Sequence, residues 1–241
     1  MKILTIGNSF SQNSTHYLPQ IFENAGIPLT IGRCSIGGCS LERHWNNAHD
    51  NTPAYGNDYN GDRTMQDMLT SDDWDYVTIQ QASHFSWKIG TYHPYFEYLA
   101  LYVKKYAPKA EIIIQQTWAY RTDNERLTEE YKISQKQMFD LIRENYAEIA
   151  DIVNAKILPV GESLRIMQEL TGDKIGELTR NPDIPAHCNR LGEYIGGLVW
   201  YAVMTGGDID GITFVPDDLK TPEHAEAAKK AAKMAVELYN K

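Results

Sequence analysis

Short apolar runs alternate along the chain with longer segments in which apolar residues recur every three or four positions. The short runs predict buried strands, and the periodic segments predict helices with one buried face. The predicted strands are Lys2–Ile6, Leu29–Gly32, Tyr76–Gln80, Glu111–Gln115 and Lys156–Pro159. The predicted helices are Thr15–Ala25, Thr64–Leu69, Tyr95–Tyr106, Leu127–Ala150, Glu162–Leu170, Arg190–Thr205 and Pro222–Tyr239. This alternation is typical of a layered α/β domain with a mainly parallel sheet.

The longest predicted helix, Leu127–Ala150, has an apolar stripe that we interpret as core packing and not as a cofactor site. Its members are Tyr131, Ile133, Met138, Phe139, Leu141, Ile142, Tyr146 and Ile149. One long irregular segment, Asn46–Arg63, is rich in Asn, Asp and Gly. Loops of this length in compact domains are often binding loops. No repeat or linker interrupts the pattern, so we expect a single domain over residues 1–241.

Composition excludes several classes of function. The chain carries 32 acidic and 23 basic side chains, a net charge of -9 without a basic cluster, so a nucleic-acid partner is not expected. No apolar stretch reaches the ~18 residues of a membrane span, so no membrane partner is expected. The N-terminus enters the first strand without a signal peptide, which favours a cytoplasmic protein, or a secreted or periplasmic one if a leader was removed. The oligomeric state stays open.

Polar residues and glycines follow four of the predicted strands. The segments are Gly7–Ser11, Gly37–Ser40, Gln80–His84 and Gln115–Trp118. In an open parallel sheet the ligand site lies outside the carboxyl ends of the strands. These segments are therefore the first candidates for a functional site.

Ser9 is a candidate nucleophile, because it follows a strand and precedes a predicted helix, where backbone N–H groups favour a developing negative charge. A helix cap or a turn serine is the alternative. A serine needs a base, and a histidine oriented by a carboxylate supplies one. His187 lies in the loop before the helix Arg190–Thr205, and Asp183 precedes it by four residues. Ser9, His187 and Asp183 are the candidate catalytic residues.

Two segments carry a family resemblance: Gly7–Ser11 near the N-terminus and Asp183 to His187 near the C-terminus resemble the first and last motif blocks of the SGNH/GDSL hydrolase superfamily. Further segments resemble an uncharacterised, mostly bacterial SGNH-like branch. They are Gly37–Trp45, Asp75–Gln80, Thr117–Tyr120 and His187–Tyr194. The resemblance covers nearly the whole chain. It implies a flavodoxin-like, three-layer αβα sandwich with a mainly parallel five-stranded sheet, the SGNH hydrolase fold.

The resemblance also implies an activity: hydrolysis of acetyl or short-acyl esters, often on carbohydrates, without a metal or an organic cofactor. By position, Ser9 attacks the ester carbonyl, His187 acts as general base and then as general acid, and Asp183 orients the imidazolium. The backbone N–H groups of Ser9 and Gly38 are the implied oxyanion donors.

Two motif blocks depart from the superfamily pattern. The third block, Gly-x-Asn-Asp, supplies an oxyanion Asn, but this chain has Gln80 and Gln81 there. A Gln amide has the same N–H donors on a longer arm, so we expect Gln80 or Gln81 to replace the Asn; loss of such a donor costs about 10²- to 10³-fold in rate. The last block is one residue longer than Asp-x-x-His, which leaves the role of Asp183 open.

The remaining aromatic and histidine residues fit a substrate pocket better than a metal site. His44, His49, His84 and His93 lack the spacing of metal ligands on one helix face. His84 and Trp118 follow strands and are predicted to line the substrate pocket, where aromatic rings suit a sugar. Cys34, Cys39 and Cys188 form neither a disulfide framework nor a zinc motif, and we interpret them as structural thiols.

The sequence therefore predicts a serine ester hydrolase whose partner is a small-molecule or carbohydrate ester. One alternative is a carbohydrate-binding protein that keeps the fold with weak or no catalysis, since two motif blocks are altered. A second is an acyltransferase that uses the same residues to pass the acyl group to an alcohol. Product analysis with added acceptors separates the acyltransferase from the hydrolase.

Overall fold

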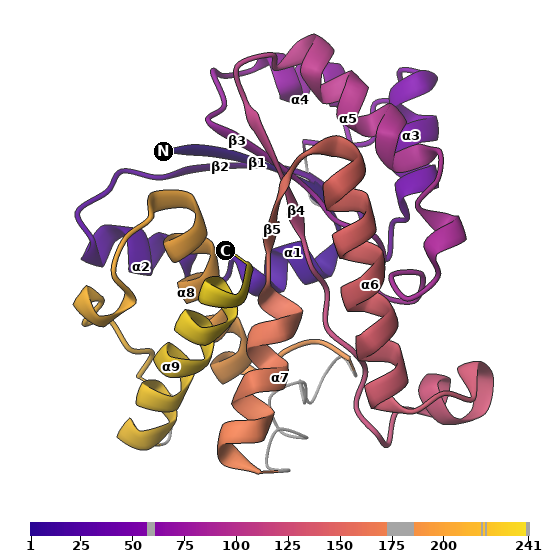
Figure 1. Ribbon diagram of the computed structural model, residues 1–241. Helices are drawn as coiled ribbons and strands as arrows, with labels where there is room; N and C mark the ends of the chain where they lie inside the picture. Colours follow the sequence, from indigo (N-terminus) through magenta and orange to yellow (C-terminus); the bar gives the residue numbers. More distant parts are fainter. Residues whose placement is uncertain (57–60, 173–185, 218, 220, 240–241) are drawn as a thin grey trace. The chain divides into compact units, whose positions relative to one another are not determined.

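Five strands form one sheet in the order β2-β1-β3-β4-β5. The computed structural model describes residues 1–56, 61–172, 186–217, 219 and 221–239 (Figure 1). The strands are β1 (Lys2–Gly7), β2 (Thr30–Ser35), β3 (Tyr76–Ile79), β4 (Glu111–Gln115) and β5 (Lys156–Leu158). β1 pairs in parallel with β2 and β3, and β3 pairs in parallel with β4. All five strands were predicted from the sequence, and the α/β fold with a mainly parallel five-stranded sheet is confirmed.

Internal contacts divide the chain into two compact units, each built from three separate stretches. The first unit comprises Met1–Ser11, Pro28–Gln115 and Glu144–Ile157. The second unit comprises Gln12–Ile27, Gln116–Arg143 and Leu158–Lys241. The units interleave along the sequence, and a single domain over the whole chain stays a prediction.

The first unit holds most of the sheet and three helices. Its strands β1, β3 and β4 are largely buried, as expected for parallel strands, whereas β2 at the edge of the sheet is mostly half-buried. Ile3, Leu4 and Ile6 of β1 are fully buried. The helices are α3 (Leu41–His49), α4 (Met65–Thr70) and α5 (Tyr95–Tyr106). Ser40 caps α3, and Thr64 forms a capping box with Asp67 at the start of α4. These caps satisfy backbone N–H groups that the first turn leaves unpaired.

The second unit is built from helices. They are α2 (Leu18–Asn24), α7 (Val160–Thr171), α8 (Arg190–Thr205) and α9 (Pro222–Tyr239), and α9 packs along both α7 and α8 (Figure 1). The buried face of α9 consists of alanines: Ala225, Ala228, Ala231, Ala232 and Ala235. Small side chains allow close approach of neighbouring helices. Two further helices, α1 (Ser9–Ser14) and α6 (Gln135–Val153), run from one unit into the other.

Several predicted boundaries were wrong. The predicted helix Thr15–Ala25 corresponds to the shorter α2, and α1, which spans Ser9–Ser14, was not predicted as a helix. The predicted helix Leu127–Ala150 begins at Gln135, because Arg126–Tyr131 forms a π-helical turn that ends at Lys132 with φ +55°. The start of the predicted loop Asn46–Arg63 belongs to α3.

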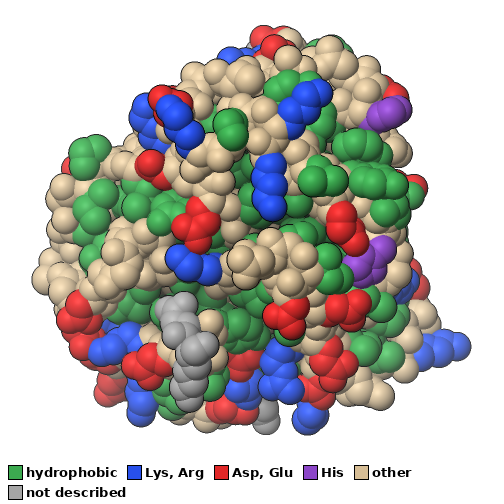
Figure 2. Space-filling model, turned by 45° about the horizontal axis from the view of Figure 1, so that its top comes forward, with side chains coloured by type: hydrophobic (Ala, Val, Ile, Leu, Met, Phe, Trp, Pro, Cys, Tyr) green, Lys and Arg blue, Asp and Glu red, His purple; other side chains and the backbone are tan. Residues whose placement is uncertain are grey.

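The predicted core stripe is largely confirmed. Its buried members are Met138, Phe139, Ile142, Tyr146 and Ile149, and the other three are half-buried. All three cysteines are buried and free of disulfides. In the described part of the chain, no helix is long and apolar enough to cross a membrane. On the face shown in Figure 2, Lys and Arg side chains are scattered among Asp and Glu.

Candidate active site

Ser9 lies at the sharp turn from β1 into α1. The turn is tight at Gly7, where a Cβ atom would lie 2.4 Å from Ser11 Oγ and 2.9 Å from Gln80 Oε1. Its neighbours Asn8, Phe10 and Ser11 are buried, whereas Ser9 is half-buried. Of residues 8 to 11, Ser9 is therefore the one that reaches the surface, in the position that a nucleophile needs.

Gln80 fixes this turn through its side-chain amide. Its Oε1 accepts from Ser11 Oγ at 2.7 Å, and its Nε2 donates to Asn8 Oδ1 at 3.1 Å and to the Gln81 carbonyl. Asn8 in turn accepts from the Phe10 N–H at 3.0 Å and donates to the Cys39 carbonyl at 3.2 Å. Both amide hydrogens of Gln80 thus have acceptors inside the first unit. An oxyanion role for Gln80 would require an exchange of one of these bonds.

Gln81 is equally committed to bonds within the first unit. Its Oε1 accepts from the N–H groups of Leu41 at 3.0 Å and Ala82 at 2.8 Å. Its Nε2 donates to Thr91 O at 2.9 Å and to Thr91 Oγ1 at 3.2 Å. The amide therefore joins the end of β3 to the start of α3.

Gly38 is exposed and has φ +62°, a conformation that favours glycine. Among the described residues, no acceptor takes its N–H. A backbone donor without an intramolecular partner can bind an oxyanion. The structure therefore leaves the predicted Gly38 donor available, in contrast to the two Gln amides.

His44 holds the turn at Ser9 through a hydrogen bond to the Gly7 carbonyl. It is fully buried; its Nε2 lies 2.9 Å from the Gly7 carbonyl and its Nδ1 lies 2.9 Å from Tyr55 Oη. Because a carbonyl only accepts, Nε2 carries the proton and Nδ1 accepts from the Tyr55 hydroxyl. Burial lowers the pKa of His44 to about 4, so the ring is neutral near pH 7. Sequence reasoning missed this residue as a support of the turn.

His187 lies in the second unit, in a loop held on both sides by side chains. Trp118 Nε1 donates to the carbonyl of Ala186 at 2.9 Å, and Asn13 Oδ1 accepts from the N–H of Cys188 at 2.6 Å. Ala186 has φ +85°, so the chain turns sharply just before the histidine. Burial lowers the pKa of His187 below its ordinary value, which favours the neutral base.

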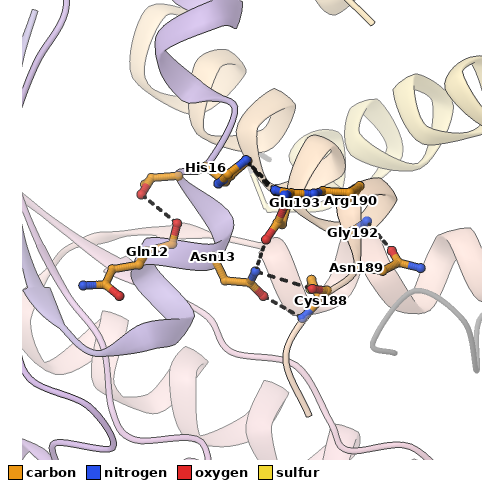
Figure 3. A network of polar contacts seen from close by, with 9 residues as sticks. Gln12, Asn13, His16, Cys188, Asn189, Arg190, Gly192 and Glu193 are labelled. Carbon is orange, nitrogen blue, oxygen red and sulfur yellow. Dashed lines mark hydrogen bonds and ion pairs between the residues drawn. The ribbon is translucent and has the colours of Figure 1, made fainter. Parts of the chain in front are cut away.

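A buried carboxylate completes the clamp on this loop (Figure 3). Asn13 Nδ2 donates to Glu193 Oε1 in α8, and Glu193 Oε2 accepts from Arg190 at 3.1 Å. Arg190 also donates to His16 Nε2 at 2.6 Å. Residues of α1 and α8 therefore fix the backbone that follows His187, and sequence reasoning missed both Asn13 and Glu193.

The other predicted site residues are distributed over both units. Ser9, Gly38, Gln80, Gln81 and His84 belong to the first unit, while His187 and Trp118 belong to the second. The ring of His84 lies 4.2 Å from that of Phe85. Asp183 lies outside the described residues. Among those described, no group of three or more His, Cys, Asp or Glu side chains could hold a metal ion.

Comparison with known proteins identifies the family. Residues 2–235 match the model of a domain of unknown function, DUF4886. A DUF4886 family protein from Bacteroides uniformis is 30% identical, with a TM-score of 0.89 over 100% of this chain and 95% of that one. No curated protein matches the sequence.

Solved SGNH-type structures have the same fold. A presumed SGNH hydrolase from Slackia heliotrinireducens is 25% identical, with a TM-score of 0.62 over 85% of this chain and 98% of its own. An acetyl xylan esterase is 12% identical, with a TM-score of 0.58 over 84% of this chain and 99% of its own. These likenesses confirm the fold that the motif blocks implied. The chain is a member of the DUF4886 family and has the SGNH hydrolase fold.

Proposed function

We propose that this protein is a serine hydrolase that cleaves acetyl or short-acyl esters, with a carbohydrate or another small alcohol as the leaving group. The observation that carries the proposal is the half-buried Ser9 at the turn after β1, surrounded by buried neighbours and fixed through Gln80. The 25% identical SGNH-type relative and the esterase with the same fold support it. The substrate class comes from these likenesses and from the motif blocks.

In the proposed reaction, Ser9 Oγ attacks the ester carbonyl while His187 accepts the hydroxyl proton. The tetrahedral intermediate collapses, and His187 gives the proton to the departing alcohol, which leaves an acyl group on Ser9. Water then attacks the acyl-enzyme by the same route, which regenerates Ser9 and releases the acid. The lowered pKa of His187 keeps the base neutral near pH 7.

The proposed oxyanion donors are the backbone N–H groups of Ser9 and Gly38. The Gly38 N–H without an acceptor supports this assignment. Gln80 and Gln81 remain candidates only if they exchange a present bond, so we assign them first the task of holding the turn. Asp183 stays the proposed partner of the His187 ring.

A serine-reactive fluorophosphonate tests activation of Ser9 without knowledge of the substrate. We expect intact-mass analysis and peptide mapping to find one adduct, on Ser9. The Ser9→Ala variant should lose the adduct and about a thousandfold or more of ester turnover, whereas the control Ser134→Ala, an exposed serine before α6, should keep both. A Ser9→Ala variant that hydrolyses as fast as wild type would refute the assignment.

A carbohydrate-binding protein with little or no catalysis is the second candidate. The full commitment of both Gln amides favours it, because this chain then offers fewer oxyanion donors than the superfamily pattern. Glycan binding by a protein that forms no fluorophosphonate adduct and cleaves no ester in a broad panel would decide for it.

A further inference from the structure

A cavity of about 400 Å³ opens in the second unit beside Trp118, between the start of α6 and α7. Its volume lies within the range of small-molecule sites, about 300–1,000 Å³. Trp118, Phe139 and Leu164 form apolar walls, and all three side chains are buried. None of the catalytic steps above accounts for this cavity.

Two amides at the cavity have unused hydrogen-bonding capacity. Gln168 Nε2 donates to Gln135 Oε1 at 3.3 Å. Among the described residues, the side-chain nitrogen of Gln135 and the side-chain oxygen of Gln168 have no hydrogen-bond partner. One donor group and one acceptor group beside aromatic walls suit the hydroxyls and the ring of a sugar.

One cation at the cavity, Arg143, has no carboxylate partner among the described residues. Lys136 pairs with Asp140 at 2.6 Å, and Arg165 pairs with Glu162 at 2.7 Å and also with Glu169. Each acidic side chain that lines the cavity, Asp140 and Glu169, thus has a basic partner, although Glu169 shares Arg165 with Glu162. Arg143 stands over the Phe139 ring, 5.8 Å from its centre, and has no carboxylate partner in the part of the chain that the structure describes.

The guanidinium groups of Arg143 and Arg165 both lie over the Phe139 ring. Arg165 also lies against the Phe139 ring, 5.3 Å from its centre. Burial raises the pKa of Tyr239 to about 12, and the negative charge of Glu162 adds to the rise, while the Gln116 amide and the positive charges of Arg143 and Arg165 oppose it. In a chain of net charge -9, a guanidinium without a carboxylate partner among the described residues, such as that of Arg143, is a group that an anionic ligand would use.

We propose that this cavity binds the alcohol part of the substrate and that the alcohol is a sugar bearing a carboxylate, which Arg143 binds. The cavity joins the candidate catalytic machinery through Trp118, which lines it and donates to Ala186, the residue before His187. The histidine of a serine hydrolase protonates the leaving alcohol, so a cavity attached to its loop fits the alcohol side. A guanidinium binds a carboxylate with two parallel hydrogen bonds. The inference rests on the proposed esterase function.

The test compares an acetylated methyl glucuronoside with its uronamide, which is neutral and has nearly the same shape. For wild type we expect kcat/KM for the uronate ester to exceed that for the uronamide by about tenfold or more. Arg143→Gln should lower kcat/KM for the uronate ester to about the value for the uronamide, which removes this preference. Lys109→Gln, which changes an exposed cation of the first unit, should keep the preference.

Binding to the Ser9→Ala variant separates this inference from the proposed function. Calorimetry with deacetylated methyl glucuronoside should detect binding that Arg143→Gln in the same background weakens about tenfold or more. Such binding without any ester turnover would uphold the cavity and refute the esterase. Turnover with equal kcat/KM for the two esters, or binding unaffected by Arg143→Gln, would refute the cavity and leave the esterase standing.

Discussion

The turn at Ser9 and the loop at His187 are held by different kinds of bonds. Neutral amides and a neutral histidine fix the Ser9 turn, and Gln80, Gln81 and His44 are fully buried. A buried carboxylate, Glu193, holds the His187 loop through Asn13 and is paired with Arg190. A saturated neutral network loses stability when one member is removed, because its partners stay buried without bonds. Loss of the bonds that hold the His187 loop should instead affect the position of His187.

Removing the Gln80 side chain should destabilise the protein at the Ser9 turn, with the largest change in unfolding free energy that we predict. Gln80→Leu leaves Ser11 Oγ and Asn8 Oδ1 each without one buried partner. We expect the free energy of unfolding to fall by about 3 kcal/mol, since each unsatisfied buried group costs about 1–3 kcal/mol. Urea unfolding measures the change. The exposed control Gln66→Leu should stay within about 0.5 kcal/mol of wild type, and an equally mild effect of Gln80→Leu would show that the network does not stabilise the turn.

A fall in pH should weaken the network at the Ser9 turn in particular, because His44 belongs to that network. In the folded protein the pKa of His44 is lowered to about 4 by burial, against an ordinary value of 6.5. The unfolded chain binds the proton first, so the stability contributed by the neutral ring is present above pH 6.5 and is lost as pH falls toward 4. Between pH 7.5 and 5 this loss amounts to about 2 kcal/mol.

The measurement is urea unfolding at both pH values on wild type and on His44→Gln. The variant should show a pH dependence that is smaller by about 2 kcal/mol, whatever its stability at pH 7.5. His49→Gln, which changes an exposed histidine of the same helix, is the matched control. If wild type and His44→Gln lost stability equally on acidification, His44 would not be the group that titrates.

Sequence patterns located the secondary structure best where an element follows its own local signals. α5, α8 and α9 begin and end at the predicted residues; all three have a clear apolar period, and side chains cap the starts of α8 and α9. α3 was missed because its buried positions are Leu41, His44 and Ala48. A histidine at the centre of that stripe makes it look polar, and its burial depends on Tyr55, which no local pattern pairs with it.

The residues of the candidate site also differ in whether sequence patterns could predict them. Ser9 and His187 stand in segments that resemble motif blocks of the SGNH/GDSL superfamily, and this resemblance singled them out as candidates. Asn13 and Glu193 were not predicted, since their bonds to the Cys188 backbone and to each other join residues up to 180 positions apart. The commitment of the Gln80 and Gln81 amides depends on tertiary partners for the same reason.

Releasing the His187 loop should give the smallest of the predicted effects, a change in the activation free energy of the reaction. Asn13→Ala removes the acceptor of the Cys188 N–H and the donor to Glu193. For a protein that hydrolyses esters as proposed, we expect kcat to fall about tenfold, or about 1.4 kcal/mol in the activation barrier, with KM nearly unchanged. The control Asn24→Ala removes an exposed amide that binds the Thr213 backbone N–H in the same way, at 2.8 Å, and should keep kcat.

The pH profile of kcat distinguishes positioning from mere structural support. Burial lowers the pKa of His187, and a general base must be neutral, so wild type should lose activity only as pH falls below 6.5. A released loop exposes the ring, its pKa rises toward the ordinary value, and the acidic limb of Asn13→Ala moves to higher pH. A drop in kcat with an unmoved limb, or the same drop in Asn24→Ala, would mean that Asn13 does not position His187.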